Sequence, residues 1–315
     1  MVGLSLPAVR ALTPASCLSA WPLPPAYKGS SEVFIDANLQ LALAAAKQVC
    51  RGLWLPRQPP QHPPDPLLSL PAAQLSKAGK SVQIIVPDAP ELDRAEKRFG
   101  NAASLVENVS FGALSGARRT GLAALLGGLG NSVAPASAGL TKPADVYLIV
   151  NLSCVELQPL ETFVNERMPP GSTAVTFNLE LDTQRGDLGL PGFPGKDLHY
   201  RFLSRFLPVL YLRPRAYSKT VAVAPFLLNY SGATFREYPG PWQVMLRADS
   251  GDLACIAERV EPRYGLGEAK EEMLAAMGLN TEDEGSSLAF LRRGYKTATW
   301  WEEGGDQEAS AAWRS

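Results

Sequence analysis

The chain has 315 residues, a formal net charge of -1 and 46% hydrophobic residues, so it can bury the core of one large α/β domain or two small ones. The near-neutral charge lacks the basic excess of most nucleic-acid-binding proteins, and no nucleic-acid partner is expected. Four scattered cysteines and two histidines give neither a disulfide scaffold nor the paired ligands of a zinc site, and no metal or cofactor is expected.

The N-terminal segment, residues 1–29, has the composition of an organelle leader. From Met1 to Ser31 there is no Asp or Glu, while Arg10, Lys28 and several hydroxyl residues lie among Ala, Leu and Pro. A secretory signal fits less well, because Pro7 and Arg10 interrupt its apolar region. The composition therefore predicts a transit peptide, with a disordered tail as the alternative.

A helix is predicted directly after this segment, followed by a break. Ser30 to Glu32 form a helix start signal, and apolar residues recur at helical spacing from Phe34 to Val49. From Arg51 to Pro71, frequent proline excludes both a helix interior and a central strand. Residues 51–79 are therefore expected to form a proline-rich insertion, as a loop or an extended polyproline segment.

Strands and helices then alternate along the middle of the chain. The expected strands are Ser81–Asp88, Asp145–Asn151, Ser172–Asp182 and, more weakly, Leu105–Phe111; the expected helices are Pro90–Phe99 and Leu157–Met168. This alternation is typical of parallel β-α-β units with helices on both faces of the sheet. The uncharged stretch Thr120–Thr141 is rich in Gly, Ser, Ala and Pro, so it is interpreted as a short buried helix and a loop, not as a membrane span.

The last third of the chain changes character. Residues Leu198–Leu210 fit an amphipathic helix whose arginines face solvent, either packed on the sheet or lying on an anionic membrane surface. After it, four strands and a helix are expected at Val223–Asn229, Ala233–Tyr238, Trp242–Ala248, Leu253–Val260 and Glu268–Met277. The expected fold is α/β, a three-layer, mostly parallel Rossmann-like sheet with a C-terminal antiparallel meander. It forms a single domain over residues 30–278, and residues 279–315 form a largely disordered tail.

Polar residues after the predicted parallel strands are the candidates for a ligand site. Asp88, Asn151 and Asn178 fall at or near strand carboxyl ends, where parallel α/β sheets bind ligands, although helix capping or turn formation explains them more simply. The nearby glycine clusters match neither a P-loop nor the dinucleotide fingerprint. Cys154, with His199 as its only plausible base, is a weaker candidate for nucleophilic catalysis.

The stretch FREYPGPWQVML, Phe235 to Leu246, is dense in aromatic and charged residues. Strand alternation places Arg236 and Tyr238 on one face, and Pro239-Gly240 suits the centre of a type II turn, after which Trp242 packs inward. The structural interpretation is a corner between two strands. The functional interpretation is a partner surface formed by Arg236, Tyr238 and Trp242, because these residue types are enriched at interface hot spots.

This stretch, with DVYLIVN before it and GDLACIAERVEPR after it, resembles a plastid family, domain of unknown function 1995, that includes the low photosystem II accumulation proteins of plants and algae. The resemblance covers Ser30 to about Gly278 and is strongest from Asp145 onward, while the proline-rich insertion departs from it. It offers no catalytic residue to carry over.

The resemblance implies a location in the chloroplast stroma or at the periphery of the thylakoid membrane. It also implies a non-catalytic role in photosystem II assembly, performed by binding assembly intermediates or other auxiliary proteins. The competing expectation is a plastid enzyme or ligand-binding protein that uses Asp88, Asn151 and Asn178 for a nucleotide or a phosphorylated metabolite.

Overall fold

The computed structural model describes residues 9–12, 32–50, 79–116, 141–221, 226–279 and 298–315. They fall into two compact units, Met1–Leu198 and His199–Ser315. The sequence predicts instead a single domain over residues 30–278. Most of the predicted leader, of the proline-rich insertion and of the uncharged stretch lies outside the described residues.

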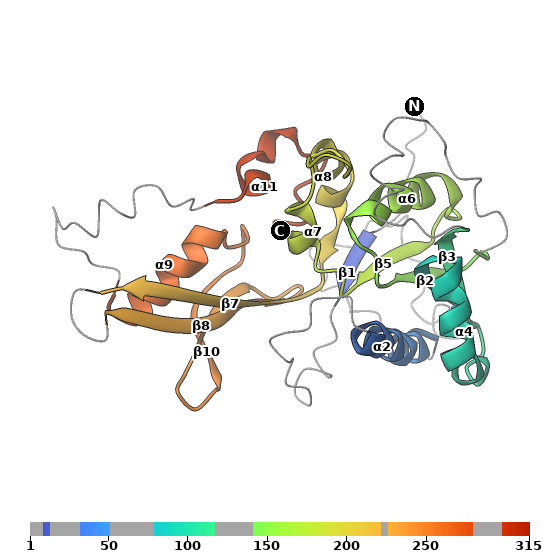
Figure 1. Ribbon diagram of the computed structural model, residues 1–315, viewed down its shortest axis with the longest axis horizontal. Helices are drawn as coiled ribbons and strands as arrows, with labels where there is room; N and C mark the ends of the chain where they lie inside the picture. The colour runs from blue at the N-terminus through green and yellow to red at the C-terminus, as the bar shows by residue number, and fades with distance from the viewer. Residues whose placement is uncertain (1–8, 13–31, 51–78, 117–140, 222–225, 280–297) are drawn as a thin grey trace, which may run out of the picture. The chain divides into compact units, whose positions relative to one another are not determined.

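A parallel sheet forms the centre of the first unit (Figure 1). Its strands are β1 (Val9–Leu12), β2 (Val82–Asp88), β3 (Val109–Ser115), β4 (Val146–Ile149) and β5 (Thr173–Phe177). They lie side by side in the order β3-β2-β4-β5-β1, and every neighbouring pair is parallel. Nearly all side chains of β2 and β4 are buried, as expected for strands covered on both faces.

Helices cover both faces of this sheet (Figure 1). On one face lie α2 (Glu32–Cys50) and α4 (Ala89–Ser104), joined by an ion pair of 2.7 Å between Arg94 and Asp36. On the other face lies α6 (Leu157–Thr162), which a π-helical turn, Phe163–Arg167, continues. Short helices α7 (Leu181–Arg185) and α8 (Asp197–Arg201) follow β5. The predicted α/β class with three layers is confirmed.

The predicted strand at residues 105–111 begins four residues later than expected, at Val109. Leu105 ends α4, and Asn108 has a φ of 65°, so the chain turns before it enters β3. The apolar residues Leu105 and Val106 resemble a strand start in sequence, but here they belong to the end of a helix and to a turn.

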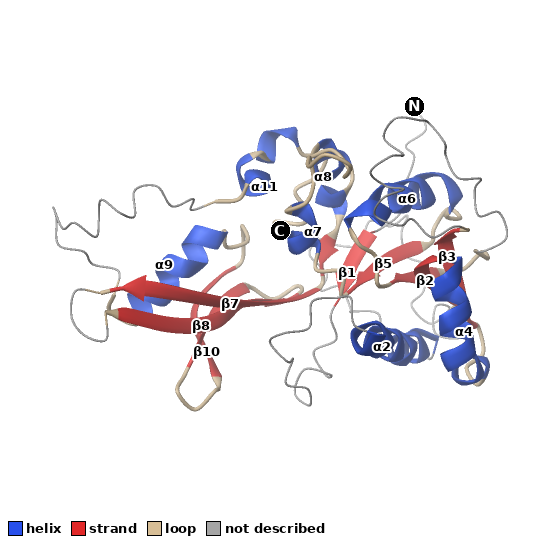
Figure 2. Ribbon diagram, in the orientation of Figure 1, coloured by secondary structure: helices blue, strands red, loops and turns tan. Residues whose placement is uncertain are grey.

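A separate antiparallel sheet, in the order β10-β9-β8-β7, forms the second unit (Figure 2). Its strands are β7 (Leu210–Thr220), β8 (Leu227–Glu237), β9 (Trp242–Arg247) and β10 (Leu253–Arg259); the two-residue strand β6 (Leu207–Pro208) precedes them. The helix α9 (Leu266–Ala276) packs against β9 and β10, over a core that contains Tyr230, Trp242 and Met273. The predicted antiparallel meander and its closing helix are confirmed, although the sequence does not predict β7.

Two elements of the second unit differ from the sequence-based prediction. The sequence predicts two strands separated by a turn where the structure has one continuous strand, β8, because Gly232 stays in the ladder between β7 and β9. The predicted helix at Leu198–Leu210 is cut to α8 and a 3₁₀ turn, Leu203–Arg205. Pro208 lacks the amide hydrogen that a longer helix would need, and the chain enters β7 instead.

Residues 298–315, placed by their composition in a disordered tail, are ordered. They form α11 (Trp300–Glu303) and a 3₁₀ turn, Gly305–Gln307. Trp301 and Trp313 are both buried, and tryptophan removes more apolar area from water than any other side chain, which explains why this acidic segment packs. The prediction of a disordered tail is therefore corrected for residues 298–315.

Candidate functional site

Two of the predicted ligand residues meet at the carboxyl end of the parallel sheet, together with a third asparagine that the sequence analysis missed. The amide Nδ2 of Asn38, on α2, donates to Oδ1 of Asn151 at 2.9 Å. Nδ2 of Asn178 donates to Oδ1 of Asn38 at 2.8 Å, and Nδ2 of Asn151 donates to the carbonyl oxygen of Ile35 at 3.3 Å. This asparagine cluster fastens α2 to the ends of β4 and β5.

The backbone at these strand ends explains why asparagine stands there. Asn151 has a φ of 59° and Asn178 a φ of 52°, in the left-handed region that asparagine tolerates better than most residues. Asn38 is buried, and the sequence did carry a signal for it. It is a polar residue at the apolar spacing of the predicted helix, four residues after Phe34 and three before Leu41.

The other chemical candidates of the first unit are Asp88 and Cys154. Asp88 Oδ1 accepts a hydrogen bond from the backbone nitrogen of Glu91 at 3.0 Å and caps α4, which is the simpler of its two interpretations. Burial, and then the charge of Asp187, raises the pKa of the Cys154 thiol to about 11. The thiol is therefore protonated near neutral pH and is a poor nucleophile. Its suggested base, His199, lies in the interior of the second unit.

The aromatic stretch at residues 235–246 is buried in the second unit. Trp242 packs inward as predicted and is fully buried. Arg236 is only 2% exposed; its Nε donates to the carbonyl oxygen of Gly240 at 3.1 Å and its Nη1 to that of Ser315. The guanidinium of Arg236 binds backbone carbonyls of its own unit. The prediction that Arg236 belongs to an exposed partner surface is therefore wrong. Tyr238 remains half-buried.

The corner itself turns one residue earlier than predicted. The backbone nitrogen of Gly240 donates to the carbonyl oxygen of Glu237 at 2.7 Å, so Tyr238 and Pro239 are the central residues, and the peptide bond between them is cis. A type II turn at Pro239-Gly240 would require a positive φ at Gly240, which the structure does not have.

Arginines and aromatic rings alternate across the second unit from this corner. The arginine-aromatic series runs Tyr238, Arg236, Trp242, Arg263, Trp313, Arg314, with 4.5 to 5.5 Å between each guanidinium carbon and the centre of each neighbouring ring. Guanidinium groups are attracted to ring faces at such distances, most strongly where water is excluded. Three members of the series, Tyr238, Arg236 and Trp242, lie in the stretch Phe235–Leu246. The other three lie further along the chain.

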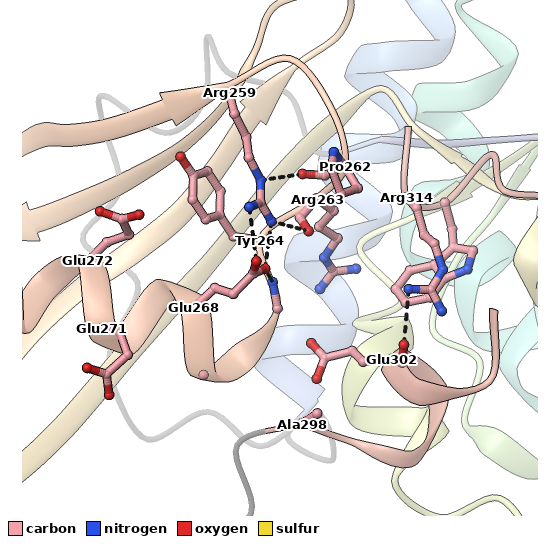
Figure 3. Close-up of a pocket in the computed structure, with 13 residues that line it drawn as sticks. Arg259, Pro262, Arg263, Tyr264, Glu268, Glu271, Glu272, Ala298, Glu302 and Arg314 are labelled. Atoms are coloured by element: carbon pink, nitrogen blue, oxygen red, sulfur yellow. Dashed lines mark hydrogen bonds and ion pairs between the residues drawn. The ribbon is translucent and has the colours of Figure 1, made fainter.

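A cavity of about 600 Å³ opens beside this series (Figure 3). One wall runs from Arg259 to Glu272, and the other consists of Ala298, Glu302, Trp313 and Arg314. The guanidinium of Arg259 is already bound, since it donates to the two carboxylate oxygens of Glu268 at 3.0 and 2.6 Å and lies 4.0 Å from the ring centre of Tyr264. The hydrogen bond from Arg259 holds the pKa of Glu268 below its usual range.

Two further findings concern only the part of the chain that the structure describes. No group of three or more His, Cys, Asp or Glu side chains there could hold a metal ion. Of the helices described, none combines the length and the apolar character needed to cross a membrane.

Comparison with known proteins identifies one family. The model of a domain of unknown function (DUF1995) matches residues 7–271. No curated protein and no solved structure matches the chain significantly. The matched range contains the asparagine cluster and all four strands of the antiparallel sheet, and it ends before the ordered segment at residues 298–315.

Proposed function

The chain belongs to the DUF1995 family, and we propose that it is a non-catalytic plastid protein that binds assembly intermediates or auxiliary proteins of photosystem II. The resemblance of its corner stretch to the low photosystem II accumulation proteins supports the identity of the partners. The leader-like composition of residues 1–29 supports the chloroplast location. Binding without catalysis agrees with the helix cap made by Asp88 and with the raised pKa of the Cys154 thiol.

The observation that carries this proposal is the exposed apolar end of the hairpin formed by β7 and β8. These strands pair over eleven residues each (Figure 2). Where β8 begins, Phe226 is 61% and Leu227 is 52% exposed. Large apolar side chains grouped on a surface mark contact sites for other proteins or membranes.

The backbone of Phe226 adds a second observation. Its φ is 60°, in the left-handed region that a bulky side chain rarely adopts. Such strain persists where the surrounding structure imposes it, and it is common at binding sites. The hairpin end therefore holds an aromatic side chain in an exposed position, as a partner contact requires.

Affinity isolation of the tagged protein from chloroplasts tests the proposal. The wild-type protein should retain photosystem II subunits or auxiliary factors, and the variant Phe226→Ser/Leu227→Ser should lose them about tenfold or more, since each 1.4 kcal/mol of lost binding free energy is a factor of ten. Leu253→Ser is the matched control, because Leu253 is an exposed apolar residue (36%) of the same unit, outside the hairpin. Normal photosystem II accumulation in plants that lack the gene would rule the proposal out.

A second candidate function, binding of a nucleotide or phosphorylated metabolite, is favoured by the position of the asparagine cluster. The strand order reverses between β2 and β4, and doubly wound sheets bind ligands beyond the strand ends at such a point. Asp88 ends β2, and Asn151 follows β4. A thermal-shift screen distinguishes the two functions: a ligand at a hundred times its Kd stabilises the native state by about 2.7 kcal/mol. No shift with nucleotides or sugar phosphates would remove this candidate.

A further inference from the structure

The segment of residues 298–315 binds to its own unit as a peptide binds to a groove. It has little regular structure, and backbone hydrogen bonds attach it to residues distant in sequence. The nitrogen of Ala309 donates to the carbonyl oxygen of Tyr200 at 2.7 Å, and that of Trp313 to Ser204 at 3.3 Å. The nitrogen of Arg263 donates to the carbonyl oxygen of Arg314 at 2.8 Å.

Three side chains of the segment occupy specific positions on that surface. Glu302 lies at the N-terminus of α9, where its Oε1 accepts from the backbone nitrogen of Leu266 at 2.9 Å. A carboxylate is favoured there by the unpaired amides and the helix dipole. Trp313 is buried, and its ring follows Arg263 in the arginine-aromatic series.

Glu308 makes the third contact, through an enclosed side chain. Its side chain is 2% exposed, its Oε1 lies 3.1 Å from Nε2 of His199, and Arg314 donates to both of its oxygens at 2.9 and 3.0 Å. The ring of His199 is in edge contact with Trp300 and Trp313. Burying a carboxylate is costly unless charged or hydrogen-bonding partners compensate for the lost water. Because His199 and Arg314 supply such partners here, the position suits an acidic residue.

The segment is acidic, and the surface beneath it carries both positive and negative groups. The segment carries four carboxylates, at Glu302, Glu303, Asp306 and Glu308, against the single cation of Arg314. The surface beneath it presents Arg236, Arg263 and the positive end of α9, together with the carboxylates of Glu268, Glu271 and Glu272 at the cavity. Opposite charges, as at Glu302 and the start of α9, favour correct pairing and speed association.

The segment fills this surface incompletely and lies outside the family domain. A cavity of about 600 Å³ lies beside these contacts, lined on one side by Ala298, Glu302, Trp313 and Arg314 and on the other by residues between Arg259 and Glu272 (Figure 3). The family match ends at residue 271, so the docking surface belongs to the domain and the segment that covers it does not.

From these contacts we propose that the surface beneath residues 298–315 is a docking site for an acidic, tryptophan-bearing peptide of a partner protein, and that the chain's own segment occupies it in cis. This inference rests on the proposed function. It adds a second contact site for the partner and states which chemical groups the partner must carry. A partner must compete with a segment of the same chain, and a covalent link raises the effective concentration of such a segment above that of a free peptide. Binding at this site is therefore suppressed until the segment is displaced.

The test measures binding of a fluorescein-labelled peptide with the sequence of residues 298–315 to the full-length protein by fluorescence polarisation. Glu308→Gln/Trp313→Ala weakens the tethered segment and leaves the docking surface intact, so it should bind the peptide about tenfold more tightly than wild type, or better. When Arg263→Ala, a change on the docking surface, is added to the Glu308→Gln/Trp313→Ala variant, the increase in peptide affinity should disappear. A labelled peptide that carries the same two changes, Glu308→Gln and Trp313→Ala, should not bind.

Equal peptide affinity of the wild type and a folded Glu308→Gln/Trp313→Ala variant would overturn the inference. If that variant does not fold, the full-length chain is given a protease site within residues 280–297 and cleaved, and exchange of the nicked segment for the labelled peptide is followed. Exchange supports the docking site, and complete retention of the segment overturns it. Peptide binding is measured without photosystem II, so failure of the proposed function in chloroplasts is seen separately.

Discussion

At the scale of single residues, burial decides which reactive groups are available. Cys154 is buried and its thiol pKa is raised to about 11, whereas Cys255, on β10, is exposed. Thiolate fraction and access together control the rate of alkylation. Burial raises the pKa of both thiols, so access to solvent is the main difference between them.

We expect iodoacetamide at pH 8 to modify Cys255 in the native protein and to modify Cys154 only after unfolding. Peptide mass spectrometry at increasing times measures both sites in one sample. The Cys255→Ser variant is the control, and its native form should show almost no labelling at Cys154. Fast native labelling of Cys154 would contradict the enclosed site next to Asp187.

The surroundings of Glu308 determine how its charge contributes to the stability of the folded protein at low pH. Burial opposes its ionisation, but hydrogen bonds from Arg314, Trp313 and His199 outweigh burial and hold the pKa of Glu308 below its ordinary value of 4.5. A carboxyl with a lower pKa in the folded state adds stability above its ordinary pKa and loses it as the pH falls through the folded value. His199 and Arg314 both face this carboxylate.

The stability of the wild type relative to Glu308→Gln should therefore shrink as the pH falls from 6 towards 3. Urea unfolding at several pH values measures the difference between the two proteins. Glu303→Gln changes an exposed carboxylate of the same segment and should stay parallel to wild type. A pH-independent difference between wild type and Glu308→Gln would show that the contacts of Glu308 do not depend on its charge.

At the scale of elements, the asparagine cluster joins a helix to two strands that it does not follow in sequence. Replacing Asn38 by Leu should leave the amides of Asn151 and Asn178 without their partner and cost about 1–3 kcal/mol of unfolding free energy. Gln40→Leu, at an exposed position of the same helix, should change the unfolding free energy by less than about 0.5 kcal/mol. Equal urea midpoints for the two variants would mean that the cluster does not stabilise the fold.

The centre of β8 depends on a close approach of backbones at Gly232. A Cβ atom there would lie 1.9 Å from the carbonyl oxygen of Met245 and 2.8 Å from Cε of Met273. Gly232→Ala must therefore push β9 or α9 away, at a cost of about 1–3 kcal/mol or more. Gly100→Ala, in α4 where the added atom meets nothing within 4 Å, should be neutral or stabilising. Thermal unfolding compares the two, and equal destabilisation would refute the steric argument.

At the scale of the whole molecule, each unit has its own sheet and its own core. The first is centred on a parallel sheet with residues such as Ile84 and Leu148, and the second on Trp242 and Met273 between an antiparallel sheet and α9. Separate cores open separately when one of them is weakened. The effect of a core substitution should therefore stay within its unit.

Hydrogen exchange of the Gly232→Ala variant tests this separation. Amide exchange should rise across β7 to β10 and remain at wild-type rates in β2, β4 and β5. The wild-type protein under the same conditions provides the reference rates. Faster exchange in the parallel strands as well would mean that the two units unfold as one.

The sequence by itself determined the elements whose signal is local. Helical spacing of apolar residues located α2, and the uniformly apolar runs at β2 and β4 indicated a sheet buried on both faces. The inward packing of Trp242 also followed from strand alternation. These features depend on neighbours within a few residues along the chain.

Tertiary structure alone decided which distant groups meet. Arginine is usually a surface residue, yet Arg236 is buried, and the backbone carbonyls of Gly240 and Ser315 accept its hydrogen bonds. The order of residues 298–315 likewise depends on a surface built by residues far away in sequence, and not on the segment's acidic composition. Long-range hydrogen bonds and burial outweigh local propensity at such positions, so no pattern along the chain could predict them.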